Sequence, residues 1–105
     1  MQPQKSKLVF LEPAKDDILS TAAFHLEKVG PISARRITDT IIDTIDRLAD
    51  FPLIGPKHPD PVLAAKGYRK LVAAEQYVCI YKVFADTVYI YRIVNGATDY
   101  PKLLK

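Results

Sequence analysis

The sequence predicts an α+β domain of two layers, in which a helix hairpin packs on one face of an antiparallel sheet and the elements follow the order β-α-α-β-β-β. Valine, isoleucine, tyrosine and phenylalanine crowd residues 67–94, a composition typical of strands. Between residues 14 and 49, isoleucine, leucine and alanine recur every three or four positions, which indicates two amphipathic helices. We therefore expect a single domain that spans residues 1–105.

The β-rich stretch, GYRKLVAAEQYVCIYKVFADTVYIYRIV, is predicted to form a three-stranded meander. Polar breaks at Glu75-Gln76 and Ala85-Asp86 divide it into runs of about seven or eight residues, a normal strand length. Connections this short allow only antiparallel neighbours. The middle run, residues 77–84, has Lys82 as its single charged side chain, so we expect it in the interior of the sheet.

Two helices are predicted to precede this meander, after a short strand at residues 7–11 (KLVFL). Pro13 suits the first turn of the first helix, and Gly30-Pro31 ends that helix with a turn that requires an antiparallel hairpin. The second helix is expected to begin near residues 32–33. The residues predicted to be buried against the sheet are Ile18, Ala22, Leu26, Ile37, Ile41, Ile45 and Leu48.

Two segments are expected to be irregular. Residues 51–66 contain four prolines and are predicted to form an extended surface loop, because proline denies a segment regular hydrogen bonding. The final stretch, NGATDYPKLLK, predicts a turn and then a short tail that is either disordered or docked on the sheet.

Composition narrows the cellular setting. No apolar run approaches the ~20 residues needed to span a bilayer, and the start, MQPQKSKLVFLEP, lacks the apolar core of a signal peptide. The single cysteine, Cys79, cannot form an internal disulfide. We therefore expect a cytoplasmic protein with no membrane association.

The net charge of +3 is unevenly distributed. Residues 1–56 hold seven basic and eight acidic side chains, whereas residues 57–105 hold eight basic and four acidic ones. The sheet half is thus the basic half, which suits an anionic partner such as nucleic acid or an acidic protein surface. Lysines scattered over a solvated sheet face would give the same balance.

The sequence offers little for metal or cofactor chemistry. His25, His58 and Cys79 show no ligand spacing, and the isolated glycines form no phosphate-binding loop, so no cofactor is expected. The candidate target-binding residues are polar groups on or beside the meander: Arg69, Lys70, Lys82, Arg92, Asn95, Asp99 and Tyr100. Basic groups beside aromatic rings can bind a nucleic acid, but any half-exposed sheet displays them too. Arg69 could instead pair with Asp99 across the end of the sheet.

Four segments in this order resemble the RelE/ParE family of toxins from bacterial type II toxin–antitoxin modules. They are FLEPAKDDI, IDRLADFPLIG, GYRKL leading into VCIYKVF, and VYIYRIVNGATDYPKLL, which together extend over nearly the whole chain. The resemblance implies a compact toxin and a cognate antitoxin protein that wraps around it. It implies contact with DNA only through that antitoxin.

The family divides by target, and the resemblance favours its ParE side. RelE-like members cleave mRNA in the ribosome, whereas ParE-like members poison DNA gyrase. Many members end the last strand in H-G-R-R-D; here residues 95–99 are N-G-A-T-D, and the middle-strand arginine of the ribonucleases corresponds to Val78. Ala97 and Val78 cannot stabilise transition-state charge. We expect inhibition of gyrase by binding rather than an enzyme; the alternatives are a ribosome-dependent endoribonuclease and a decayed member that still binds antitoxin.

Overall fold

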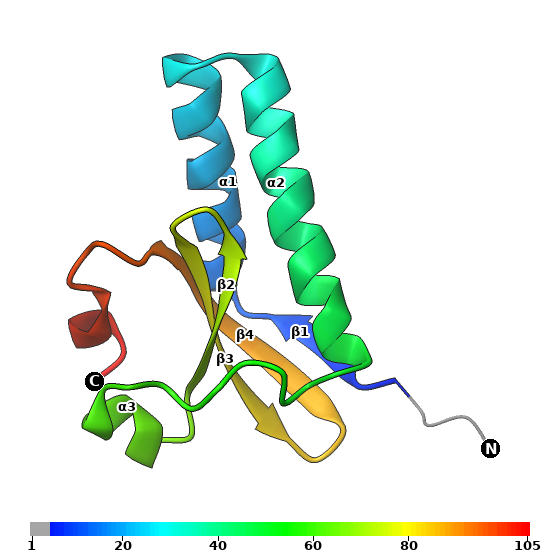
Figure 1. Ribbon diagram of the computed structural model, residues 1–105, viewed down its shortest axis with the longest axis vertical. Coiled ribbons are helices and arrows are strands. Elements are labelled where there is room, and N and C mark those ends of the chain that lie inside the picture. The colour runs from blue at the N-terminus through cyan, green and yellow to red at the C-terminus, as the bar shows by residue number, and fades with distance from the viewer. Residues whose placement is uncertain (1–4) are drawn as a thin grey trace.

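The computed structural model describes residues 5–105, and its elements confirm the predicted two-layer α+β fold (Figure 1). The strands are β1 (Lys7–Phe10), β2 (Arg69–Ala74), β3 (Tyr77–Phe84) and β4 (Thr87–Asn95). The helices are α1 (Glu12–Lys28), α2 (Pro31–Asp46) and α3 (Pro61–Ala65), with short 3-10 helices η1 (Arg47–Ala49) and η2 (Tyr100–Leu103). Among these residues, no helix combines the length and apolar character needed to cross a membrane.

The four strands lie in the order β1-β4-β3-β2, and β2, β3 and β4 form the predicted antiparallel meander. Its turns fall at the predicted polar breaks, where Glu75 and Ala85 take positive φ values of 48° and 54°. Such left-handed turn residues match the twist of the strands in a tight hairpin. Strand β3 is interior, as expected, and β1 adds to the free side of β4 in parallel, with Phe10 opposite Ile90.

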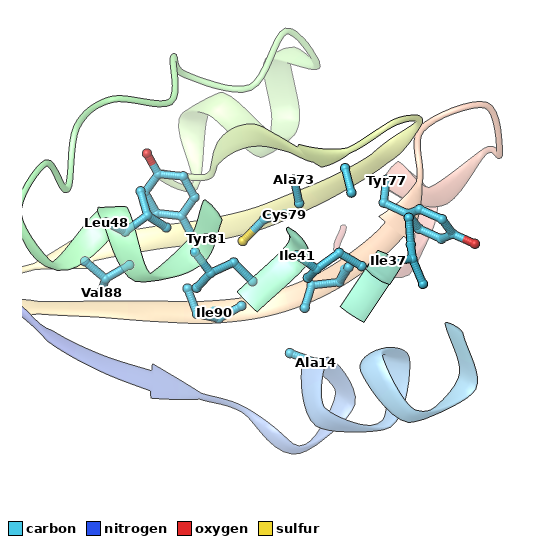
Figure 2. Close-up of a cluster of buried hydrophobic side chains, with 13 residues drawn as sticks. Ala14, Ile37, Ile41, Leu48, Ala73, Tyr77, Cys79, Tyr81, Val88 and Ile90 are labelled. Atoms are coloured by element: carbon cyan, nitrogen blue, oxygen red, sulfur yellow. The ribbon is translucent and has the colours of Figure 1, made fainter. Parts of the chain in front are cut away.

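The main core lies between the helix hairpin and one face of the sheet (Figure 2). The predicted face of α2 is buried: Ile41 and Ile45 are fully covered, as is Leu48 in η1. They meet Cys79 and Tyr81, the side chains that alternate toward the helices along β3. The phase predicted for the second helix is therefore confirmed, although the helix begins at Pro31, slightly earlier than expected.

The predicted burial of α1 is wrong in part. Leu26 is 55% exposed, and Ile18 and Ala22 are only half-buried. The buried residues of α1 are Ala14 and Thr21, on a neighbouring stripe of the helix. The hairpin projects beyond the sheet (Figure 1), so the far end of the predicted stripe has no layer to pack against.

A second core covers part of the opposite face of the sheet. It consists of Leu63, Tyr68, Val78, Ile80, Val94 and Tyr100. The segment 51–66, predicted as an extended surface loop, instead contains the helix α3 and contributes the fully buried Leu63. Asp60 caps this helix by accepting the N–H groups of Val62 and Leu63, at 2.9 and 3.2 Å. The tail docks on the sheet through Tyr100 in η2.

Candidate functional site

The candidate residues do not form one site, and Arg92 is engaged in an ion pair with α1. Its guanidinium donates to both carboxylate oxygens of Asp17, at 2.7 and 2.9 Å. This bond to Asp17 raises the pKa of Arg92 further above its ordinary value. The same carboxylate accepts the backbone N–H of Ile93 at 2.9 Å. A bidentate pair of this kind holds Arg92 against the helix layer.

Arg69 holds the loop after η1 against the sheet. Its guanidinium donates to the carbonyl of Gly55 at 2.7 Å, and the N–H of Gly55 donates to the hydroxyl of Tyr81 at 3.0 Å. A Cβ at Gly55 would lie 2.5 Å from the carbonyl oxygen of Lys70, so the close approach requires glycine. Arg69 therefore does not pair with Asp99, whose carboxylate lies 3.9 Å from Lys102.

Lys82 lies at a groove on the face of the sheet opposite the helices. Its ammonium nitrogen sits 4.2 Å from the ring centroid of Tyr68 and 5.2 Å from that of Tyr91, within the range of a cation–π interaction. The two rings meet edge to face, with centroids 5.1 Å apart. The groove has a volume of about 430 Å³ and is lined by Lys66, Gly67, Lys82, Val83, Phe84, Tyr89 and Tyr91.

We call this surface the lysine–tyrosine groove. It joins residues from three places in the chain: the segment after α3, strand β3 and strand β4. Sequence reasoning selected Lys82 but missed Lys66, Tyr68, Tyr89 and Tyr91. The available signal was the period of two in β4, which places Tyr89 and Tyr91 on one face, with Tyr89 paired to Lys82.

The remaining candidates lie near the end of β4. The side-chain oxygen of Asn95 accepts the N–H of Ala97 at 2.9 Å, and its carbonyl accepts the hydroxyl of Thr98 at 2.7 Å, which closes the turn. Tyr100 is buried, and its hydroxyl lies 2.7 Å from Nε2 of His58. Burial raises the pKa of Tyr100. Lys70 is half-buried in β2, opposite Ile80.

Val78 is a buried apolar residue, only 5% exposed. It belongs to the second core, together with Leu63 and Tyr100. A Cβ at Gly96 would lie 2.9 Å from a methyl group of Val78, so the turn after β4 also approaches it closely. The second core thus covers the position at which the resemblance places a ribonuclease arginine.

Within residues 5–105, no group of three or more His, Cys, Asp or Glu side chains could hold a metal ion. Cys79 is fully buried, and burial raises the pKa of its thiol to about 12. A thiol with such a pKa supplies almost no thiolate at neutral pH and is unsuited to nucleophilic catalysis.

Two solved structures of bacterial toxin systems share the helix hairpin on a sheet. A chain of the "Chromosomal ParDE TA system from P. aeruginosa" shares the fold with a TM-score of 0.74 and 20% identity, covering 87% of this chain and 96% of that one. The "YoeB/ParE toxin from Agrobacterium tumefaciens" gives a TM-score of 0.55 and 21% identity, covering 83% and 94%. Among curated protein sequences, none matches significantly.

The family model described as "ParE toxin of type II toxin-antitoxin system, parDE" matches residues 8–100. The chain therefore belongs to the ParE toxin family. This confirms the resemblance to RelE/ParE toxins, and an antitoxin partner follows from membership of a type II system.

Proposed function

We propose that this toxin inhibits DNA gyrase by binding it and does not cleave RNA. The observation that carries the proposal is the burial of Val78 at 5% exposure. Cleavage of a phosphodiester by a 2′-hydroxyl needs a base, an acid and positive charge around the developing phosphorane. A buried valine at the middle-strand position supplies none of these, and neither does Ala97 in the turn that follows β4.

The charges around the end of β4 support the same proposal. Arg92, the nearest cation in the strand, is held by Asp17 on the edge of the sheet. Asn95, Thr98 and Tyr100 carry no positive charge at neutral pH, and Asn95 and Tyr100 are occupied by hydrogen bonds within the fold. Membership of the ParE family supports a gyrase target over a ribosomal one.

We assign target binding to the lysine–tyrosine groove. It presents the ammonium groups of Lys66 and Lys82 beside the rings of Tyr89 and Tyr91, on the basic half of the chain. Such a surface suits an acidic face of a protein target, with the lysines steering association and the tyrosines supplying contact area. Gyrase and the ribosome are both cytoplasmic, so a cytoplasmic location is part of this proposal.

We assign antitoxin binding to the outer face of the helix hairpin. Leu19 and Leu26, one heptad apart on α1, are 69% and 55% exposed, and Val29 and Ile32 at the tip are 70% and 75% exposed. Leu19 also lines a groove of about 380 Å³, together with Phe10, Lys15, Ile18 and Ile42. An exposed apolar stripe of this kind suits the apolar face of a partner segment that orders on binding.

Two assays run side by side test the target. Purified toxin is added to a gyrase supercoiling reaction and to a translating extract. We expect inhibited supercoiling and intact mRNA. Codon-dependent cleavage of mRNA in the extract would support the endoribonuclease instead. Inactivity in both assays, with antitoxin binding retained, would indicate a decayed toxin.

A further inference from the structure

His58 is a buried histidine in its neutral form. The residue is only 4% exposed. Nδ1 accepts the backbone N–H of Asp60 at 3.0 Å, so this nitrogen carries no proton. The ring proton is therefore on Nε2, which donates to the hydroxyl of Tyr100 at 2.7 Å. Both ring nitrogens are satisfied, and the bonds select one tautomer.

This histidine connects the C-terminal segment 100–105 to the rest of the fold. Tyr100 enters the second core, and Leu104 packs against it. The ammonium nitrogen of Lys105 lies 3.2 Å from the carboxylate of Asp60, the residue that also bonds His58. The turn from His58 to Asp60 thus holds both ends of the segment.

We propose an acid-sensitive latch at the turn from His58 to Asp60, in which a second proton on His58 opens this turn, so that segment 100–105 leaves the sheet and uncovers Val78 and Val94. A proton on Nδ1 would turn that nitrogen from an acceptor into a donor facing the N–H of Asp60. It would also place a positive charge in a buried position, where charge is costly unless it is paired. This device is independent of the toxin's target.

The charged and titratable groups around His58 favour the closed latch at neutral pH. Burial, and then the ammonium group of Lys70 on β2, lower the pKa of His58; the carboxylate of Asp60 opposes them. That carboxylate is already engaged by Lys105 and by the N-terminal N–H groups of α3. Tyr68, whose carbonyl accepts the N–H of His58, and Tyr100 are neutral throughout the range.

An NMR titration of the full chain from pH 8 to pH 4.5 tests the latch. The chain has two histidines, and His25 is a natural reference because it also bonds a tyrosine, with 3.2 Å between Nε2 and the hydroxyl of Tyr77, yet is half-buried. We expect loss of the NOEs from the Tyr100 ring and the Leu104 methyls to the second core. The loss should have the same pH midpoint as the titration of His58, which lies on the acid side of the ordinary histidine pKa. The NOEs between β3 and β4 should persist.

Two variants separate the latch from general acid sensitivity. His58→Gln places a side-chain amide donor near Nε2 and cannot titrate, so the NOEs of segment 100–105 should persist down to pH 4.5. The matched variant His25→Gln should leave the wild-type midpoint unchanged. The latch is overturned if the wild-type NOEs survive titration of His58, if they vanish only with global unfolding, or if His58→Gln loses them at the wild-type midpoint. Should His58→Gln fail to fold, the wild-type titration alone decides.

Discussion

Asp17 and Arg92, 75 positions apart, close the edge of β4 at the point where β1 ends. Strand β1 pairs with β4 only as far as Ile90. Beyond it, the carboxylate of Asp17 accepts the N–H of Ile93 as well as the guanidinium of Arg92. A helix side chain therefore replaces the missing strand and satisfies an edge that would otherwise be open to pairing with another chain.

Removal of this carboxylate should destabilise the fold. Asp17→Ala leaves a mostly buried guanidinium and a backbone N–H without their acceptor, which we expect to cost about 2–4 kcal/mol. Urea denaturation of the variant measures this change in the free energy of unfolding. The exposed neighbour Asp16 provides the control, since Asp16→Ala should change stability by less than about 0.5 kcal/mol. Equal effects of the two substitutions would contradict an edge-closing role for Asp17.

The core face of α2 should carry much of the helix layer's stability. Ile41→Ala and Ile45→Ala each leave a cavity at a fully buried position and should lower the free energy of unfolding by roughly 2–5 kcal/mol. Ile32, on the first turn of the same helix, is 75% exposed, and Ile32→Ala should cost less than about 0.5 kcal/mol. Thermal or urea unfolding compares the three variants; similar losses at Ile32 and Ile41 would mean that the helix phase is wrong.

Stability should fall with acidification because of His58. Burial lowers the pKa of His58 in the folded protein from its ordinary value of 6.5, so between the two values the unfolded chain binds the extra proton. The contribution of His58 is complete above pH 6.5 and declines as the pH falls through the folded-state value. Unfolding curves at a series of pH values should show this slope in the wild type and a shallower one in His58→Gln. A slope unchanged by the substitution would assign it to other groups.

Lys82 should matter for target binding and little for folding. If the lysine–tyrosine groove binds gyrase, Lys82→Ala should raise the concentration needed for half-inhibition of supercoiling about tenfold, which corresponds to roughly 1.4 kcal/mol. Lys28, an exposed lysine at the far end of α1, serves as the matched control. Circular dichroism confirms that both variants remain folded. If Lys82→Ala inhibits supercoiling at the same concentration as the wild type, the target binds another surface.

The outer face of the hairpin should determine antitoxin affinity. Leu26→Lys puts a charge into the exposed apolar stripe and should weaken binding to the antitoxin at least about tenfold, as measured by calorimetry. Because Leu26 is 55% exposed, the toxin alone should keep its stability. Ser20→Lys, at an exposed position about a third of a turn away from Leu26 on α1, is the comparison and should bind nearly normally. Identical affinities of the two variants would move the antitoxin to another surface.

Local patterns in the chain predict the layers, the meander and the phase of α2. These features depend on neighbours in the chain: the spacing of Ile37, Ile41 and Ile45, and the turns at Glu75 and Ala85. Local periodicity and turn geometry depend on residues close together in the chain, so they can be predicted without knowledge of the fold. The positions matching ribonuclease arginines, Val78 and Ala97, were also visible by resemblance.

Which polar side chains remain available to a partner depends on contacts between segments that are distant in the chain. In the sequence, Arg92 and Tyr100 cannot be distinguished from other polar residues of a half-exposed sheet. In the fold, Arg92 bonds Asp17, 75 positions away, and Tyr100 bonds His58, 42 positions away. Contacts of this kind also set which face of α1 is buried. Asp17 on α1 faces β4, and the spacing of apolar residues in α1 does not predict this orientation. Parallel pairing of β1 and the lysine–tyrosine groove likewise join distant segments. Such contacts depend on how the layers meet, a long-range property that a pattern of neighbours does not contain.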